Sequence, residues 1–299
     1  MRKLVLLIAI AAGAAYAAAA ARPAADAVGG RIVFTSDRAG NFDIWSMRAD
    51  GSHLRRLTTT ARLEEHCPAW SPNGRWIAFT RRGVLPADLY VMRSDGSHVR
   101  RVLKLRGEET CPRWSPDGRR LVFVRMDNTL PKPVHAVYTV GVGGRGLRKL
   151  SPIEDAWEIS DWRGGRIVFE STQPPEDGLN IWSMRADGSD RRLIAGQTTV
   201  ANFRHPHWSP DGRRIVFTTD ADGHEQVWTM NADGSGQVAV TRSPVGSFEP
   251  GWSPGGGKIV YVNVVGNSQP DIFVANANGS DVRRLTSSRR VDLEPDWTS

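Results

Sequence analysis

The sequence is poor in the features that mark several large classes of protein. It has two cysteines in 299 residues, too few for a disulfide framework, so a hydrophobic core has to carry the fold. It has no Gly-x-Ser-x-Gly elbow, no phosphate-binding Gly-Lys-Ser/Thr loop and no His-Glu-x-x-His metal motif. Beyond residue 27, no apolar run is long enough to cross a bilayer. None of these motifs therefore assigns an activity or a cofactor, and we expect neither a cofactor nor a bound metal.

The N-terminal segment differs from the rest of the chain. Arg2 and Lys3 precede an apolar stretch from Leu4 to Ala21, and Ala25-Asp26-Ala27 fits a small-x-small cleavage site. This pattern predicts a signal peptide over residues 1–27, hence a protein exported to the periplasm or secreted. The alternative is a membrane anchor, since the stretch is long enough to span.

Repetition dominates what remains. The segment Trp114-Ser-Pro-Asp-Gly-Arg-Arg-Leu-Val-Phe123 returns almost unchanged at Trp208–Phe217. Tryptophans that end equivalent segments recur at intervals of 44, 48, 46, 44 and 45 residues, at Trp70, Trp114, Trp162, Trp208, Trp252 and Trp297. A period of about 40–45 residues with four short strands is typical of a propeller blade.

Each repeat predicts four strands, A to D. Strand A ends at the tryptophan, and a Ser-Pro-Asp-Gly turn leads to an apolar strand B such as Arg214–Phe217. Strand C, such as Asn180–Met184, is followed by an Ala-Asp-Gly-Ser hairpin turn and a short Arg-Arg-Leu-Thr strand D.

The two ends of the chain complement each other. Residues 31–58 supply strands B, C and D without an A strand, and Glu294–Trp297 supplies an A strand without the others. The sequence therefore predicts an all-β, six-bladed β-propeller over residues 28–299, closed by the C-terminal strand joining the N-terminal blade.

This repeat, covering residues 31–297, resembles that of the TolB-type propellers. The resemblance rests on Pro-x-Trp-Ser-Pro-Asp-Gly, Ile-Trp-x-Met-x-Ala-Asp-Gly-Ser and Arg-Arg-Leu-Thr. It implies the propeller without the α/β domain that precedes it in TolB. It also implies a binding role, because the partner in that family is a peptidoglycan-associated lipoprotein. Fold alone does not fix activity.

The two faces of such a ring differ in content. The A–B and C–D turns are monotonous, which indicates a structural role; Asp220-Ala-Asp-Gly223 resembles a calcium loop only faintly, without the closing Glu. The B–C and D–A connections vary, and variable loops on a rigid scaffold are where binding sites lie. The arginine pairs at 55–56, 100–101, 191–192 and 283–284 fall on strand D around the rim. That spread argues against a nucleic-acid groove, despite a net charge of +7.

The strands that enter the tunnel predict the candidate site. The residues three before each tryptophan form one ring, made of Cys67, Cys111, Ile159, His205, Glu249 and Glu294. Together with their neighbours they predict an acidic, histidine-bearing tunnel mouth, lined by Glu65, His66, Glu109, Trp157, Glu158, Phe203, Arg204, His205, His207, Phe248, Glu249, Asp292 and Glu294.

This mouth has two interpretations. One is a pocket for a peptide or small cationic ligand, in a monomeric scaffold that binds a protein or cell-envelope component. The other is solvated loop ends with aromatics packed between blades. An enzyme, a lyase or hydrolase acting on polysaccharide or peptide through His66, Arg204, His205 and His207, is the alternative function. His205, Glu249 and Glu294 suit a metal, but the repeat does not fix their distances.

Two further expectations concern the blades. Cys67 and Cys111 lie one repeat apart in the same register, which suits either a disulfide between adjacent blades or two buried thiols. Residues 115–162 lose the Asp-Gly-Ser turn and carry a long loop, 125–135, with two prolines, which predicts a strand-poor or mobile blade.

Overall fold

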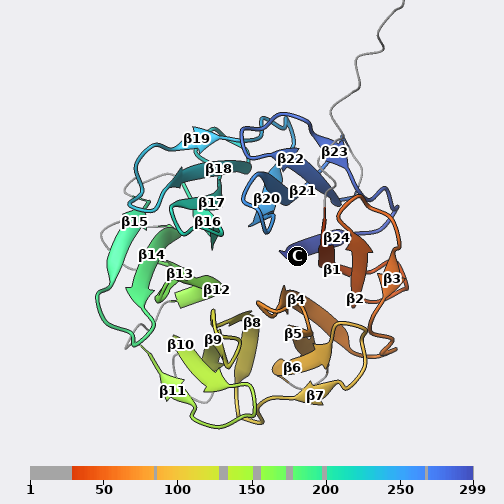
Figure 1. Ribbon diagram of the computed structural model, residues 1–299, viewed down its shortest axis with the longest axis vertical. Coiled ribbons are helices and arrows are strands. Elements are labelled where there is room, and N and C mark those ends of the chain that lie inside the picture. Colours follow the sequence, from red (N-terminus) through yellow and green to blue (C-terminus); the bar gives the residue numbers. More distant parts are fainter. Residues whose placement is uncertain are drawn as a thin grey trace, which may run out of the picture.

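A computed structural model describes residues 29–83, 86–127, 134–150, 156–172, 178–196, 201–266 and 269–298. The predicted signal peptide and the tip of the 125–135 loop lie outside these residues. The chain forms six four-stranded antiparallel sheets arranged as blades around a central tunnel (Figure 1). The described residues include no helix of a length and apolarity that would cross a membrane.

Each sheet runs from an inner A strand to a short outer D strand. The A strands are β4 (Glu64–Trp70), β8 (Glu108–Trp114), β12 (Ala156–Arg163), β16 (Phe203–Trp208), β20 (Ser247–Trp252) and β24 (Asp292–Thr298). The B strands are β1 (Arg31–Ser36), β5 (Trp76–Arg82), β9 (Arg120–Asp127), β13 (Arg166–Ser171), β17 (Arg214–Thr219) and β21 (Lys258–Asn263). The C strands are β2 (Asp43–Arg48), β6 (Asp88–Arg93), β10 (Val134–Gly141), β14 (Asn180–Arg185), β18 (Gln226–Asn231) and β22 (Asp271–Asn276). The D strands are β3 (Arg55–Arg56), β7 (Arg100–Arg101), β11 (Arg148–Lys149), β15 (Arg192–Ala195), β19 (Val238–Ala239) and β23 (Arg283–Arg284).

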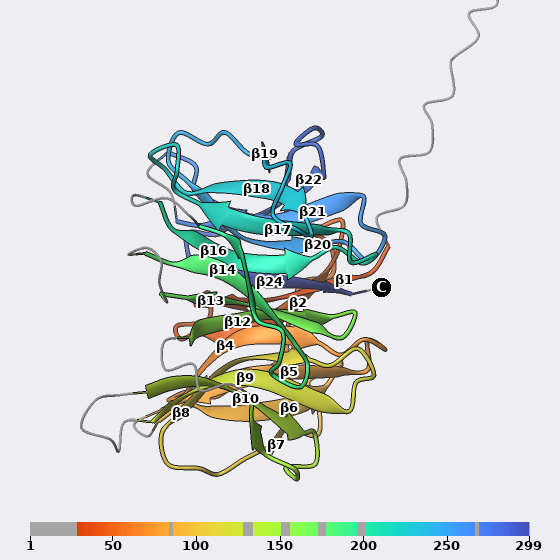
Figure 2. The same cartoon turned by 90° about the vertical axis from the view of Figure 1, so that its left-hand side faces the viewer.

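The ring closes as the sequence predicts. Strand β24 pairs antiparallel with β1, with Trp297 opposite Ile32 and Asp292 opposite Ser36. The first and last segments of the chain thus share one sheet, in the order β24-β1-β2-β3. Seen edge-on in Figure 2, the C-terminus lies at one face of the disc, which we call the turn face because the A–B and C–D turns are there. The opposite face, which carries the B–C and D–A connections, is the loop face.

The hydrophobic core lies between the blades. Strand B is buried on both sides because a neighbouring blade covers each face, which explains its unbroken apolar run. In one such cluster, Val33 and Ile44 of the first blade pack against Trp70, Ile77 and Phe79 of the second. Each fully buried side chain of this size contributes about 1.5–3 kcal/mol.

The A–B turn is held by its own side chains. In the third blade, the Ser115 hydroxyl donates to Asp117 Oδ1 at 2.6 Å, and the same oxygen accepts the Arg119 N–H at 3.0 Å. Ser209 and Asp211 repeat this arrangement in the fifth blade. The aspartates of these turns therefore cap backbone groups, in line with the structural role expected of them.

The glycine of the C–D turn also joins neighbouring blades. Gly188 has φ +88°, and a Cβ atom built there would lie 1.8 Å from the Leu150 carbonyl oxygen of the preceding blade. Gly51, Gly96, Gly144, Gly234 and Gly279 face the preceding blade's strand D region in the same way. The repeated Asp-Gly therefore serves the seam between blades as well as the turn.

Three of the four predicted arginine pairs lie on the outer strands β3, β7 and β23, whereas in the fourth pair only Arg192 is on its strand, β15. One member of a pair is drawn inward. Arg56, Arg101 and Arg284 form ion pairs with Asp43, Asp88 and Asp271, the first residue of strand C in each blade. The outer member reaches sideways instead, as when Arg55 donates to the Asp95 carbonyl of the next blade at 3.0 Å.

The expectation of a strand-poor third blade is wrong. Strands β8, β9, β10 and β11 form a complete sheet, and β9 and β10 have eight residues each. The turn survives without aspartate because backbone groups close it: Gly141 N donates to Arg145 O at 2.9 Å, and Gly144 takes the positive φ. Tyr138 occupies the strand C position that Trp182 holds in the next blade and stacks on Phe123.

Candidate functional site

A β-bulge in the A strands shapes the tunnel wall. The ladder between A and B strands shifts register between His66 and Ala69, and likewise in the blades of β8, β16 and β20. At each bulge, the residue three before the tryptophan has a φ of about +50° and precedes proline; these residues are Cys67, Cys111, His205 and Glu249, with Glu294 alike at +55°. Non-glycine residues rarely adopt this conformation, and residues held in it are found preferentially at functional sites. The bulge re-aims these side chains into the tunnel.

The strained residues are tied to the blade before them. Glu294 Oε2 accepts the Cys67 N–H at 2.7 Å, and Glu249 Oε2 accepts the Glu294 N–H at 2.7 Å. The Thr80 hydroxyl accepts the Cys111 N–H at 3.0 Å, and Glu170 accepts the N–H of His205. Several tunnel carboxylates therefore accept a backbone hydrogen bond from the following blade with one oxygen. They also place their charge in the tunnel.

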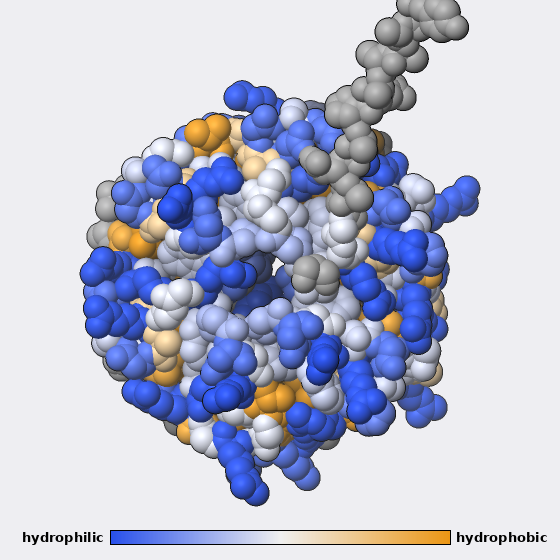
Figure 3. All heavy atoms as spheres, in the orientation of Figure 1, coloured by the Kyte–Doolittle hydropathy of each residue, from blue (hydrophilic) through white to orange (hydrophobic). Residues whose placement is uncertain are grey.

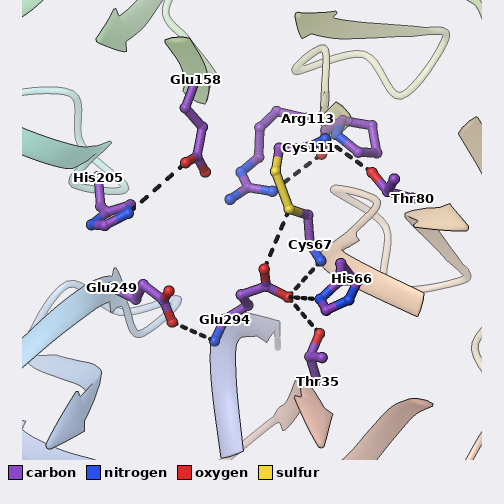
Figure 4. The surroundings of a disulfide bond; sticks show 11 residues. Thr35, His66, Cys67, Thr80, Cys111, Arg113, Glu158, His205, Glu249 and Glu294 are labelled. Atoms are coloured by element: carbon purple, nitrogen blue, oxygen red, sulfur yellow. Dashed lines mark hydrogen bonds and ion pairs between the residues drawn. A yellow bond between two sulfur atoms is a disulfide. The ribbon is translucent and has the colours of Figure 1, made fainter. Parts of the chain in front are cut away.

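A set of side chains from the A strands of all six blades meets at the centre of the tunnel (Figure 4). We call it the tunnel cluster; it lines a cavity of about 40 Å³ and consists of Cys67, Arg113, Glu158, His205, His207, Glu249 and Glu294, with Pro250 and Pro295. The Glu158 and His205 side chains approach to 3.9 Å, and Glu294 Oε2 lies 3.7 Å from His66 Nδ1. Three carboxylates thus share this small space with a single arginine.

The protonation of the tunnel cluster follows from burial and from the crowding of like charges. Burial, with Glu294 nearby, raises the pKa of Glu249 to about 8, and burial raises the pKa of Glu158 to about 7. Burial lowers the pKa of His205 to about 4, so its ring is neutral near pH 7. His66 behaves oppositely, because Glu294 and Glu64 outweigh its burial and raise its pKa. The cluster therefore exchanges protons near neutral pH.

A second, larger cavity opens on the turn face. It has a volume of about 270 Å³ and is walled by the six repeat tryptophans, Trp70, Trp114, Trp162, Trp208, Trp252 and Trp297. Figure 3 looks onto this face and shows a central hollow with hydrophilic residues at its base. Arg113 and His207 line both cavities, so they stand between the two ends of the tunnel.

Comparison with known proteins shows which sequences this chain is similar to. No family model matches the chain. The protein "Tol-Pal system protein TolB" of Anaeromyxobacter dehalogenans is 30% identical over 176 residues, which cover 54% of this chain and 40% of that protein. The chain is homologous to TolB. Because the match spans 40% of that relative, the activity and partners of the whole relative are not carried over.

Solved structures show the fold. The crystal structure of TolB from Acinetobacter baumannii superposes with a TM-score of 0.79 at 18% identity, covering 90% of this chain and 66% of that one. An oligogalacturonate lyase from Vibrio parahaemolyticus has a TM-score of 0.57 at 14% identity, covering 87% of this chain and 75% of that one. A similar fold therefore occurs in a protein named as a lyase, and the fold alone does not decide between binding and catalysis.

Three predicted mouth acids of this TolB homologue lie away from the tunnel. Glu65, Glu109 and Asp292 are fully buried and face Arg81, Arg125 and Arg38, respectively. The bulge is the reason, because one extra residue reverses which side chains face the tunnel beyond it. These acids are therefore internal ion pairs of the blades.

The aromatic residues predicted on one side of the mouth do not share one environment. Phe203 is buried in the core against Phe217, as the packing interpretation expects. Phe248 is half-buried against a core cluster, and the Trp157 side chain lies outside the described residues, as does that of Ile159. His66 packs beside Phe42, and Arg204, 39% exposed, lies 3.9 Å from Glu225 on the loop face.

Among the residues directly before the tryptophans, sequence reasoning selected His207 and missed three others that line a cavity. Arg113, Asp161 and Asp296 hold this position and line the turn-face cavity, together with His207. Asp161 and Asp296 accept the N–H groups of Trp208 and Trp70 in the following blades. Strand alternation carried the signal, because positions one and three before the tryptophan share a face.

The three residues that would suit a metal, His205, Glu249 and Glu294, do not form a compact group within the described residues. Glu158, Glu170 and His205 each offer one ligand atom within 4.8 Å of the others, whereas Glu249 and Glu294 belong to no such group. Glu170, which sequence reasoning did not select, comes from strand β13 and is 3% exposed.

The two cysteines are joined in the structure. Cys67 and Cys111 form a disulfide between adjacent blades, with Cα atoms 4.9 Å apart. The bridge closes a 44-residue separation and should contribute roughly 3–4 kcal/mol in the chain-entropy model. Alkylation of the unfolded, unreduced chain followed by mass spectrometry should label neither cysteine. Labelling of both would show that the protein carries free thiols.

Proposed function

We propose that this protein is an exported propeller scaffold whose tunnel cluster binds a positively charged segment of a protein or cell-envelope partner at the loop face. The observation that carries the proposal is the charge of the tunnel. Five carboxylates, of Glu158, Asp161, Glu249, Glu294 and Asp296, line the two cavities against the two arginines Arg113 and Arg163. Its homology to proteins named as TolB of the Tol-Pal system supports an envelope role.

The size of the tunnel cluster favours docking over catalysis. A cavity of about 40 Å³ holds little more than water, whereas sites that enclose small molecules measure about 300–1,000 Å³. The residues proposed for an enzyme are also not all in one cavity: His205 and His207 line it, but His66 packs beside Phe42 and Arg204 lies 3.9 Å from Glu225 on the loop face. The ammonium head group of a lysine presented by a larger partner matches a cavity of this size, whereas a sugar ring does not.

The test is capture of partners from an envelope fraction, compared between two isosteric variants. Glu158→Gln with Glu249→Gln removes charge from the tunnel cluster and keeps an oxygen for the Glu294 N–H. It should weaken binding roughly tenfold or more at pH 9, where both carboxylates are ionised. The matched control is Asp187→Asn with Asp233→Asn in the C–D turns, where Asn278 already performs the same capping in the last blade.

Binding should also strengthen as pH rises from 6 to 9. A cationic group favours the ionised carboxylates, and Glu158 and Glu249 lose their protons with pKa values of about 7 and 8. His66, whose raised pKa keeps it protonated at lower pH, loses its opposing charge in the same direction. Isothermal titration of the captured partner should show this trend in the wild type and a flatter one in the double variant. Equal affinity of the tunnel variant and the wild type at all pH values would refute the proposal.

A further inference from the structure

The disulfide lies in the tunnel wall next to a carboxylate of the following blade. Cys67 and Cys111 Sγ and one oxygen of Glu158 all lie within 4.8 Å of one another. Figure 4 shows the two sulfurs and Glu158 directed into the same central space from three different blades. Cys67 and Glu158 line the central cavity, and Cys111 and Glu158 are both half-buried, so the group is reachable from the tunnel.

We propose that reduction of the Cys67–Cys111 disulfide converts this group into a thiolate site for Zn²⁺ or a similar soft divalent cation, with Glu158 as the third ligand. In the oxidised protein the sulfurs are bonded to each other and offer no thiolate. The disulfide thus prevents metal binding at this site until it is reduced.

Backbone contacts should hold the sulfurs in place after reduction. Both cysteines occupy bulges with φ of 50° and 47°, each followed by proline. The Cys67 N–H is bound by Glu294 Oε2 and the Cys111 N–H by the Thr80 hydroxyl, so neither bulge depends on the sulfur–sulfur bond. Cys67 and Cys111 would therefore remain neighbours as thiols.

The distances suit the metal. Zn–S bonds of about 2.3 Å and Zn–O bonds of about 2.0–2.2 Å place ligand atoms of one tetrahedral ion roughly 3.4–3.8 Å apart. Atoms that now lie within 4.8 Å of one another need only small side-chain rotations to reach that spacing. His205, whose ring lies 3.9 Å from Glu158, or a water molecule can complete the four ligands.

The charges also balance. Two thiolates and the Glu158 carboxylate carry three negative charges, which a dication and the neighbouring Arg113 guanidinium neutralise. Arg113 lines the same cavity as Cys67 and Glu158. A cation beside a cysteine also favours its thiolate form. Glu249 and Glu294, which face the same space, favour a cation as well.

The chemistry needs one reductant and releases protons. A dithiol reduces the bridge by thiol–disulfide exchange, so the protein gains two thiols and the reductant becomes a cyclic disulfide. When the metal binds, the two thiols transfer their protons to the buffer, and both sulfur lone pairs are donated to the metal.

Cobalt(II) is the probe, because only thiolate ligands give an intense sulfur-to-cobalt charge-transfer band. The full chain is reduced with a phosphine under anaerobic conditions, freed of reductant, and titrated with Co²⁺. We expect one equivalent of Co²⁺ with a charge-transfer band in the reduced protein and none in the oxidised protein. Added Zn²⁺ should displace the cobalt and remove the band.

Variants separate this site from the carboxylates of the tunnel. Cys67→Ser with Cys111→Ser should lose the band completely. Glu158→Gln should keep it with an affinity roughly 10–100-fold lower. Glu170→Gln, in the neighbouring group that shares Glu158, should retain the band at near wild-type affinity. A reduced wild type with two titratable thiols but no band would overturn the proposal. Cobalt binding that is equal in the double serine variant would do the same, and so would unfolding of the ring on reduction.

Discussion

Deletion of residues 290–299 should unfold the whole ring instead of one blade. The deletion removes β24, which forms the A strand of the first sheet, and exposes β1 to solvent on that side. It also removes Trp297, which is 7% exposed within a core cluster, and Asp292, the partner of Arg38. Loss of the tryptophan side chain alone costs about 3–5 kcal/mol, a large part of a total stability of about 5–15 kcal/mol.

Thermal melting with circular dichroism measures this effect. Trp297→Ala should give an intermediate melting temperature, because it keeps the strand pairing and loses only the packing. The closure would be contradicted if the truncated chain melted within a degree or two of the wild type.

Gly188→Ala should be among the most destabilising single substitutions in the ring. The new Cβ would lie 1.8 Å from the Leu150 carbonyl oxygen, which is backbone and can move only if two blades separate. The substitution also places alanine at φ +88°, which costs about 1–2 kcal/mol. The clash adds roughly 1–3 kcal/mol to that cost.

Gly212→Ala is the matched control in urea denaturation. Gly212 has φ +70° in the A–B turn, but no atom lies within 4 Å of a Cβ built there. Gly212→Ala should therefore lose only the stability that an alanine at this positive φ costs. Equal losses of stability in the two variants would show that the C–D glycines serve their own turns and not the seam between blades.

The fold could be predicted because the sequence pattern of one blade recurs along the chain. Six tryptophans at nearly equal spacing, with Asp-Gly turns between them, determine the number of blades. The incomplete blades at the two ends of the chain, residues 31–58 and Glu294–Trp297, determine how the ring closes. The third blade shows the limit of this reasoning. Its turn sequence, Gly143-Gly-Arg-Gly146, departs from the repeat, yet backbone hydrogen bonds close the hairpin without the aspartate.

The candidate site was harder to predict because strand alternation fails at a bulge. Glu65 was expected at the mouth and lies instead in the core with Arg81. Arg113, which stands between the two cavities, was overlooked although it shares a face with Cys111. In five of the six repeats a Cys-Pro, His-Pro or Glu-Pro pair occupies the third and second positions before the tryptophan. This pair was the available signal for the bulge, since proline cannot donate a hydrogen bond to the ladder.

Photo-cross-linking from two matched positions tests the central claim most directly. A cross-linking amino acid replaces either Arg204, 39% exposed on the loop face beside Glu225, or Leu54, 43% exposed after the C–D turn of the first blade. Each variant is irradiated with an envelope fraction, with and without Glu158→Gln and Glu249→Gln. The account predicts a partner adduct from position 204 that the two tunnel substitutions abolish, and none from position 54. An adduct that forms equally from position 54, or that persists at position 204 without the tunnel charges, would contradict it.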